Sequence, residues 1–352
     1  MTRTGTGLQY GVIGGVDTHR DTHTAAVIDP VGRLLDHRTF PATAAGYQEL
    51  LAWLQAFGTV QRIGVEGTGA YGNGLTNYLT GQGMTVIEVD RPDRKTRRSA
   101  GKSDPIDAEA AARAAASGTR AGTPKNRTGN VEALRNLRVA RRCAISHRAD
   151  SIRRIKTLIV TAPEPLRDQL RDLPTRELIA TCTALRPDPA RIGQPCQAAK
   201  TALRSLARHH NHLTEQITEL DALITPLVEA INPRLLELNG VGADVAGQLL
   251  VTAGQNPHRI RSEAAFAMLC GVAPIPASSG RTHRHRLNRG GDRQANAAIH
   301  RIVICRLRWD PRTRAYMTRR TTEGLSKNDT IRCLKRLIAR ELYYTLTTLD
   351  DP

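Results

Sequence analysis

The sequence predicts a mixed α/β domain followed by a mainly helical and strongly basic remainder. Over the first 90 residues, short apolar runs of strand-like pattern alternate with two stretches of helical periodicity. From Asp104 onward the helical pattern dominates. The net charge is +18, and residues 259–345 hold 19 Lys and Arg against 6 Asp and Glu.

The N-terminal pattern begins with three strands and continues with alternating helices and strands. We expect strands over 10–16, 24–28, 33–40, 62–66 and 84–89, and helices over 46–57 and 71–80. Three consecutive strands followed by helix, strand, helix and strand are typical of a mixed sheet rather than of a regular doubly wound one.

The middle of the chain predicts two long helices separated by a proline-rich stretch. An arginine-rich helix is expected over 128–160, and prolines interrupt residues 161–195. From Leu203 to Ile231, apolar residues recur at alternating spacings of three and four, which is a heptad pattern. This coiled-coil pattern implies a partner helix in the same chain or in another one.

The last segment contains a pattern similar to a helix-hairpin-helix, from Leu236 to Ala246. Gly240 and Gly242 would let the backbone of the turn approach a phosphate, which the amides of the next helix would face. An ordinary helical joint whose glycines only form the bend is the alternative.

Length and composition suggest three domains and a polyanionic partner. A chain of 352 residues exceeds one usual core, and we place the domains at 1–155, 156–232 and 233–352. The positive charge favours nucleic acid, although an unrelated basic enzyme would have it too. The six cysteines form no CxxC pair and predict buried, reduced thiols. With no long apolar segment, we expect a cytoplasmic protein without a membrane partner.

Four acidic residues stand at positions that suggest a shared site. Asp17 and Glu66 end predicted strands, and Asp104 and Asp107 lie three residues apart at a helix start. Each has a structural alternative: the first two can start turns, and the pair can cap the helix. Four converging carboxylates would repel one another unless cations joined them, which favours Mg²⁺ or Mn²⁺.

Three sequence blocks carry a resemblance to a known family. Val16–His19, Val65–Gly69 and Lys102–Ala108 resemble the blocks of the DEDD transposases, the bridge-RNA-guided recombinases of the insertion-sequence 110 family. The resemblance implies a RuvC-like domain of RNase H fold, with the four acids as catalytic metal ligands. It also makes Lys102 a neighbour of a phosphate; a solvated lysine is the alternative.

A C-terminal block resembles the second domain of the same family, whose Ser–Ser/Thr–Gly segment carries the nucleophile. Ser278 matches the first serine of that segment, and Ser279 follows it. Arg281 replaces a glycine that is usual in the family, so the loop can differ here. A flexible turn is the alternative reading. The expected nucleic-acid contacts are Ser279, Arg281, Arg284, Arg286, Arg289 and Arg293.

The resemblance implies an enzyme of transposition: a site-specific DNA recombinase. A structured guide RNA would select donor and target DNA, and strands would be exchanged through phosphoserine intermediates. Dimers would assemble into a tetramer, in which the serine of one chain can complete the acidic site of another. Two alternatives remain open: a RuvC-like nuclease or resolvase that uses no serine, and a non-catalytic nucleic-acid-binding scaffold.

Overall fold

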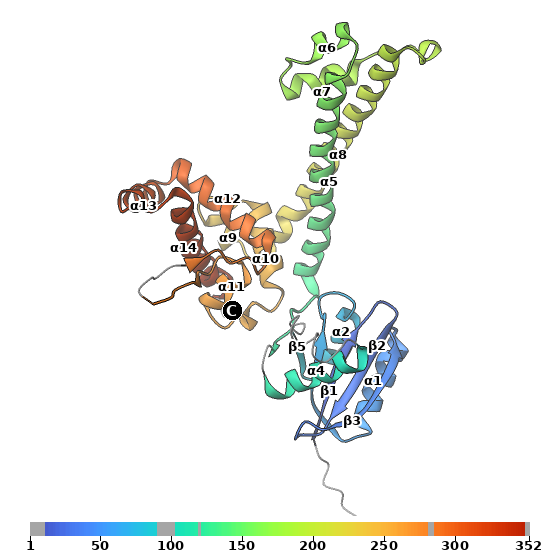
Figure 1. Cartoon of the computed structure of the whole chain (residues 1–352), viewed down its shortest axis with the longest axis vertical. Coiled ribbons are helices and arrows are strands. Elements are labelled where there is room, and N and C mark those ends of the chain that lie inside the picture. The colour runs from blue at the N-terminus through green and yellow to red at the C-terminus, as the bar shows by residue number, and fades with distance from the viewer. Residues whose placement is uncertain (1–10, 90–102, 119–120, 281–284, 349–352) are drawn as a thin grey trace, which may run out of the picture. The chain divides into compact units, whose positions relative to one another are not determined.

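The computed structural model describes residues 11–89, 103–118, 121–280 and 285–348 (Figure 1). The chain divides into two compact units. The sheet unit comprises Met1–Thr128 and Ala253–Arg261, and the helical unit comprises Gly129–Thr252 and Ser262–Pro352. The chain is thus mixed α/β at its N-terminal end and mostly helical beyond it, as the sequence predicts.

The sheet unit contains one six-stranded mixed sheet in the order β3-β2-β1-β4-β5-β6. β1 pairs antiparallel with β2 and parallel with β4, and β5 continues parallel to β4. The elements of the sheet are β1 (Gly11–Thr18), β2 (Thr22–Ile28), β3 (Leu34–Pro41), β4 (Thr59–Glu66), β5 (Val86–Val89) and β6 (Ala121–Gly122). Its helices are α1 (Ala44–Gln55), α2 (Asn73–Gly81) and α4 (Asp104–Ser117).

Helices cover both faces of this sheet. Val16 of β1 and Val65 of β4 pack in one core with leucines of α1 and α2. Ile13 of β1 packs on the opposite face with Ala112 and Ala115 of α4. Because side chains alternate along a strand, Asp17 shares the α4 face with Ile13, and Glu66 lies on the face opposite to Val65.

Glycines bring α4 into close contact with the strands. A Cβ atom on Gly15 would lie 2.1 Å from the backbone nitrogen of Ala112 and 2.2 Å from the carbonyl oxygen of Ala108. A Cβ atom on Gly64 would lie 2.4 Å from the carbonyl oxygen of Ala111. No side chain fits at these two positions, so the small residues of helix and sheet set the depth at which α4 lies.

The helical unit begins with a pair of long helices, α5 (Gly129–Val160) and α8 (Pro195–Ile231), which lie side by side (Figure 1). The heptad residues of α8 supply its buried face, which includes Leu203, Leu213 and Ile217. Leu213 and Ile217 pack against Ala144 of α5. In this structure the heptad pattern therefore has a partner helix within the chain.

The proline-rich stretch between these helices is itself partly helical. α6 (Glu164–Leu170) and α7 (Thr175–Ala184) begin directly after Pro163 and Pro174. Proline is tolerated at a helix start, where its missing N–H has no partner to lose. Prolines that predict an interruption of helical structure therefore mark the starts of helices in this stretch.

The rest of the helical unit consists of short helices and one small hairpin of strands. These elements are α9 (Arg234–Glu237), α10 (Ala243–Ala253), α11 (Glu263–Leu269), β7 (Ile275–Pro276), β8 (His285–Arg286), α12 (Arg293–Trp309), α13 (Pro311–Thr322) and α14 (Lys327–Thr347). None of the described helices is both long and apolar enough to cross a membrane.

The prediction of buried thiols is only partly right. All six cysteines are free, but Cys143 is exposed, and only Cys182 and Cys270 are buried. Cys143 lies on the outer side of α5, within 3.8 Å of His147 one turn later. Only one face of α5 packs against other helices, and a cysteine on another face of α5 stays exposed.

Candidate active site

Strand pairing makes Asp17 and Glu66 neighbours at one edge of the sheet. β1 and β4 run parallel, and Val16 lies opposite Val65, so the next residue on each strand is one of the two acids. The Thr18 hydroxyl donates a hydrogen bond of 2.7 Å to the backbone carbonyl of Glu66 and ties the strand ends together. This is the carboxyl edge at which open α/β sheets bind ligands.

The first turn of α4 supplies the other two acids. Ser103 is the N-cap residue, the helix begins at Asp104, and Pro105 follows in the first turn. Asp104 and Asp107 both lie in this turn, and Asp107 is buried. The N-cap position therefore belongs to Ser103, and the capping role considered for Asp104 is not the one that the structure has.

His19 joins this site, although the sequence analysis did not single it out. Its Nε2 atom lies 3.2 Å from Oδ2 of Asp17 and 3.4 Å from Oδ1 of Asp104. Among the described residues, Asp17, His19 and Asp104 form a group whose ligand atoms lie within 4.8 Å of one another. The Asp-Thr-His spacing was the available signal, since residues two apart in an extended chain point to the same side.

The electrostatics of the site disfavour bare negative charge. Burial raises the pKa of Asp17; the nearby charges of Asp107 and Asp104 raise it too, whereas His19 lowers it. The residues Asp17, Glu66 and Asp107 are all buried, at 6–7% exposure. A bound cation would relieve both the burial cost and the repulsion.

The serine segment lies in the helical unit. The strands β7 and β8 pair Ile275 with Arg286 and Pro276 with His285, and Ser278 and Ser279 lie in the loop between them. Both serines are exposed, as are Arg286, Arg289 and Arg293. Lys102, Arg281 and Arg284 lie outside the described residues.

The two glycines of the helix-hairpin-helix pattern have different surroundings. They lie between α9 and α10. Gly240 has a φ of +79°, and a Cβ there would come within 3.3 Å of Cys305 on α12. A Cβ on Gly242 would meet nothing within 4 Å. The turn thus requires glycine at position 240 for backbone conformation, and its open side is at Gly242.

Comparison with known proteins gives the class. Residues 14–162 match a family model described as a transposase of DEDD type, and residues 232–318 match the model of the transposase IS116/IS110/IS902 family. The first match spans all four acids, and the second spans both serines. The chain therefore belongs to a transposase family.

More closely, the chain belongs to the IS110 family of transposases. A curated relative, the "Insertion element IS900 uncharacterized 42 kDa protein" of Mycobacterium paratuberculosis, is 27% identical over 143 residues. That match covers 40% of this chain and 36% of the relative, so it spans about a third of the relative's length.

Proposed function

We propose that this chain is a site-specific DNA recombinase that cuts and rejoins strands with a divalent-metal site and a serine nucleophile. The observation that carries the proposal is the meeting of buried acids from two parallel strands and a helix start. Antiparallel β1–β3 followed by parallel β4 and β5, with helices on both faces, supports an RNase H-like architecture for the sheet unit.

The residues present fit a divalent cation. Asp17, Glu66, Asp104 and Asp107 offer hard oxygen ligands suited to Mg²⁺ or Mn²⁺, and His19 contacts two of these acids. When bound, such an ion would polarise the phosphoryl oxygens of the scissile group. The close packing of α4 on Gly15 and Gly64 would hold the acids in place without the ion.

The serine step is an exchange of phosphate esters. The Oγ atom of Ser278 attacks the phosphorus, the new serine–phosphate bond forms, and the bond to one deoxyribose oxygen breaks. The serine proton leaves to a nearby base, and the freed deoxyribose oxygen takes up a proton. A hydroxyl of the partner strand later attacks the phosphoserine and releases Ser278, so no external energy source is needed.

We extend the proposal to the partners. The exposed arginines of the helical unit suit DNA as a partner. Arg286, Arg289 and Arg293 would contact the phosphate backbone of the DNA. Guidance by a structured RNA and a dimer that pairs into a tetramer follow from the family resemblance and stay predictions. Leu220 and Leu227 on the heptad stripe of α8 are half-buried and would be covered further in such an assembly.

A covalent intermediate tests the mechanism. The protein is incubated with labelled DNA carrying the element ends, Mg²⁺ and the RNA encoded beside the gene, and is then resolved on a denaturing gel. We expect a slow, protease-sensitive band with the wild type and none with Ser278→Ala, whose DNA affinity should be unchanged because only one hydroxyl is lost.

Each alternative function predicts a different pattern of bands on this gel. A RuvC-like nuclease would cleave the DNA with no covalent band in any variant. A scaffold would bind it and leave it intact with or without metal. A band that persists in Ser278→Ala and disappears in Ser279→Ala would move the nucleophile to the second serine.

A further inference from the structure

A cavity of about 690 Å³ lies directly beside the serine loop in the helical unit. Pro274, which precedes β7, and Arg286, which ends β8, both line it, so the two stems of the loop form one wall. Tyr316 of α13 and Leu337 of α14 line it as well. Its volume is in the range of small-molecule sites, roughly 300–1,000 Å³. We name it the serine-loop cavity.

The lining combines apolar surface with strong positive charge. Val272, Ala273 and Leu325 line the cavity together with Leu337. Among the described lining residues, five cations stand against the single acid Asp329: Arg286, Arg320, Arg332, Lys335 and Arg336. Apolar walls with convergent cations suit a ligand that has one flat apolar part and one anionic part.

Two of these cations have no carboxylate partner among the described residues. The other three are paired: Arg336 with Glu263, Arg332 with Asp329, and Arg320 with Glu323. In the described part of the chain, no carboxylate lies within ion-pair distance of Arg286 or Lys335. Lys335 donates to the amide oxygen of Asn296, and burial lowers the pKa of its ammonium group. An anion would therefore be stabilised here.

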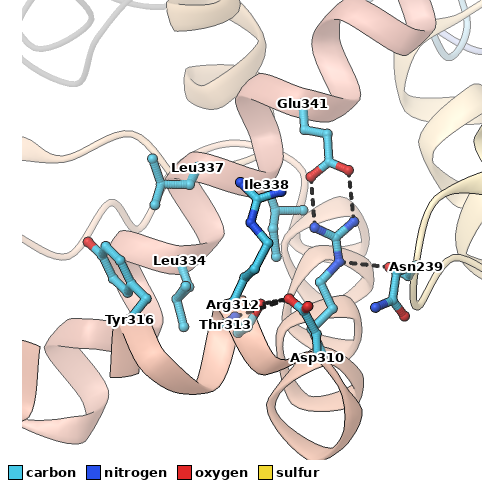
Figure 2. A pocket seen from close by; sticks show the side chains of 10 residues that line it. Asn239, Asp310, Arg312, Thr313, Tyr316, Leu334, Leu337, Ile338 and Glu341 are labelled. Carbon is cyan, nitrogen blue, oxygen red and sulfur yellow. Dashed lines mark hydrogen bonds and ion pairs between the residues drawn. The ribbon is translucent and has the colours of Figure 1, made fainter. Parts of the chain in front are cut away.

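A neighbouring cavity of about 510 Å³ contains a cation that is fully paired with a carboxylate (Figure 2). There, Arg306 donates to both carboxylate oxygens of Glu341, at 2.7 and 3.0 Å, and to the carbonyl of Asn239 at 2.7 Å. Each of the three nitrogen atoms of its guanidinium thus donates a hydrogen bond. Tyr316 and Leu337 border both cavities, and Arg312 of the neighbouring cavity also has no carboxylate within ion-pair distance in the described part of the chain.

We propose that the serine-loop cavity binds one nucleotide of the DNA strand next to the phosphate that Ser278 attacks. The phosphate of this nucleotide contacts Arg286 and Lys335, and its base lies against Tyr316 and the apolar wall. A nucleotide held by the stems of the loop would fix the strand beside the serine, which favours attack by proximity. This inference rests on the proposed function and names the substrate contact of the same loop.

Photocrosslinking of the full chain tests this binding. The probe is a single-stranded thymidine 12-mer with one 4-thiothymidine, and the crosslinked peptides are mapped by mass spectrometry. We expect crosslinks in the peptides that contain residues 272–276 and 316–337. Leu337→Trp should fill the cavity and remove them, whereas Leu223→Trp on α8 should not. Both leucines are exposed, at 48% and 57%, so both variants should fold.

The role of the positive charge of Arg286 is tested by measuring the affinity for the 12-mer. Arg286→Ala should weaken binding of the 12-mer about tenfold, since a charged hydrogen bond to phosphate is lost. Arg314→Ala is the matched control, because Arg314 is exposed on α13 and is not among the lining residues of the cavity. Its loss should change the affinity less than about twofold.

The outcomes separate this inference from the proposed function. Crosslinks that are equal in both tryptophan variants, or equal losses of affinity in the two arginine variants, would overturn the cavity proposal. Cavity crosslinks made only by a uridine 12-mer would overturn its assignment to DNA. Crosslinking requires no strand cleavage, so its presence without any serine–DNA band would refute the serine chemistry and support the cavity.

Discussion

In the acidic site, the functional side chains lie on elements that pack without a gap, whereas Ser278 lies on an exposed loop between two-residue strands. Asp17, Glu66 and Asp107 are buried, and their positions follow from strand pairing and from the depth of α4. A metal site needs fixed ligand distances, whereas a nucleophile must above all be accessible to the DNA strand that it attacks. The predictions below test this contrast.

The largest expected effect is on cleavage. Asp104→Asn should lower the rate of metal-dependent DNA cleavage by about a thousandfold, since a charged ligand of the proposed ion is lost. Glu109→Gln on the same helix is the control, because Glu109 bonds only Arg113 among the interactions described for it. Wild-type cleavage by Asp104→Asn, or cleavage undiminished in EDTA, would contradict the metal site. Mn²⁺ binding followed by electron paramagnetic resonance gives a readout independent of activity.

Gly15→Ala should be the most damaging of the stability changes. The new methyl group would meet backbone atoms of α4 at 2.1 and 2.2 Å, so the helix must move and carry the acids with it. We expect a loss of about 3 kcal/mol in unfolding free energy, the upper part of the usual overpacking range. Chemical denaturation measures it. Gly81→Ala, where a Cβ meets nothing within 4 Å, should change stability by less than about 1 kcal/mol; equal losses would refute the packing argument.

In the helical unit, the carboxylate of Asp244 links three helices. This carboxylate accepts hydrogen bonds from Arg138, Arg141 and Arg301, which joins α5, α10 and α12. Burial opposes its charge, but the three arginines outweigh burial and lower the pKa of Asp244. Asp244→Asn should cost about 2 kcal/mol at neutral pH, after allowance for partial exposure.

The pH dependence of that loss follows from the lowered pKa. A carboxylate with a lowered pKa in the folded state contributes stability that is fully present above its unfolded pKa. That contribution is lost as the pH falls through the folded value. The stability gap between wild type and Asp244→Asn should therefore be full at pH 7 and shrink below about pH 4. A gap that is constant down to pH 3 would exclude the ion pairs as its cause.

The smallest effect belongs to the second serine. Ser279→Ala should reduce recombination by less than about tenfold, since it removes only a hydroxyl next to the proposed nucleophile. Strand exchange on a plasmid substrate, compared with Ser278→Ala, provides the measurement. If the two variants were equally inactive, both hydroxyls would be required, and Ser278 could not be singled out as the nucleophile.

Much of the sheet unit could be predicted from local pattern. Short apolar runs identified the strands that carry Asp17 and Glu66, because helices on both faces of the sheet bury consecutive side chains there. The spacing of Asp104 and Asp107 predicted one helical face. The heptad pattern from Leu203 identified the buried face of α8. These features depend on neighbours in the chain, so the amino-acid order alone determines them.

Other features depend on contacts between distant residues, and only the tertiary structure decided them. Placing β1 beside β4 made Asp17 and Glu66 neighbours, and the packing of α4 gave Gly15 its role. The same packing brought Asp104 to His19, 85 positions earlier in the chain. Local periodicity carries no information on such pairs, because strand order and helix depth are set by which surfaces bury each other.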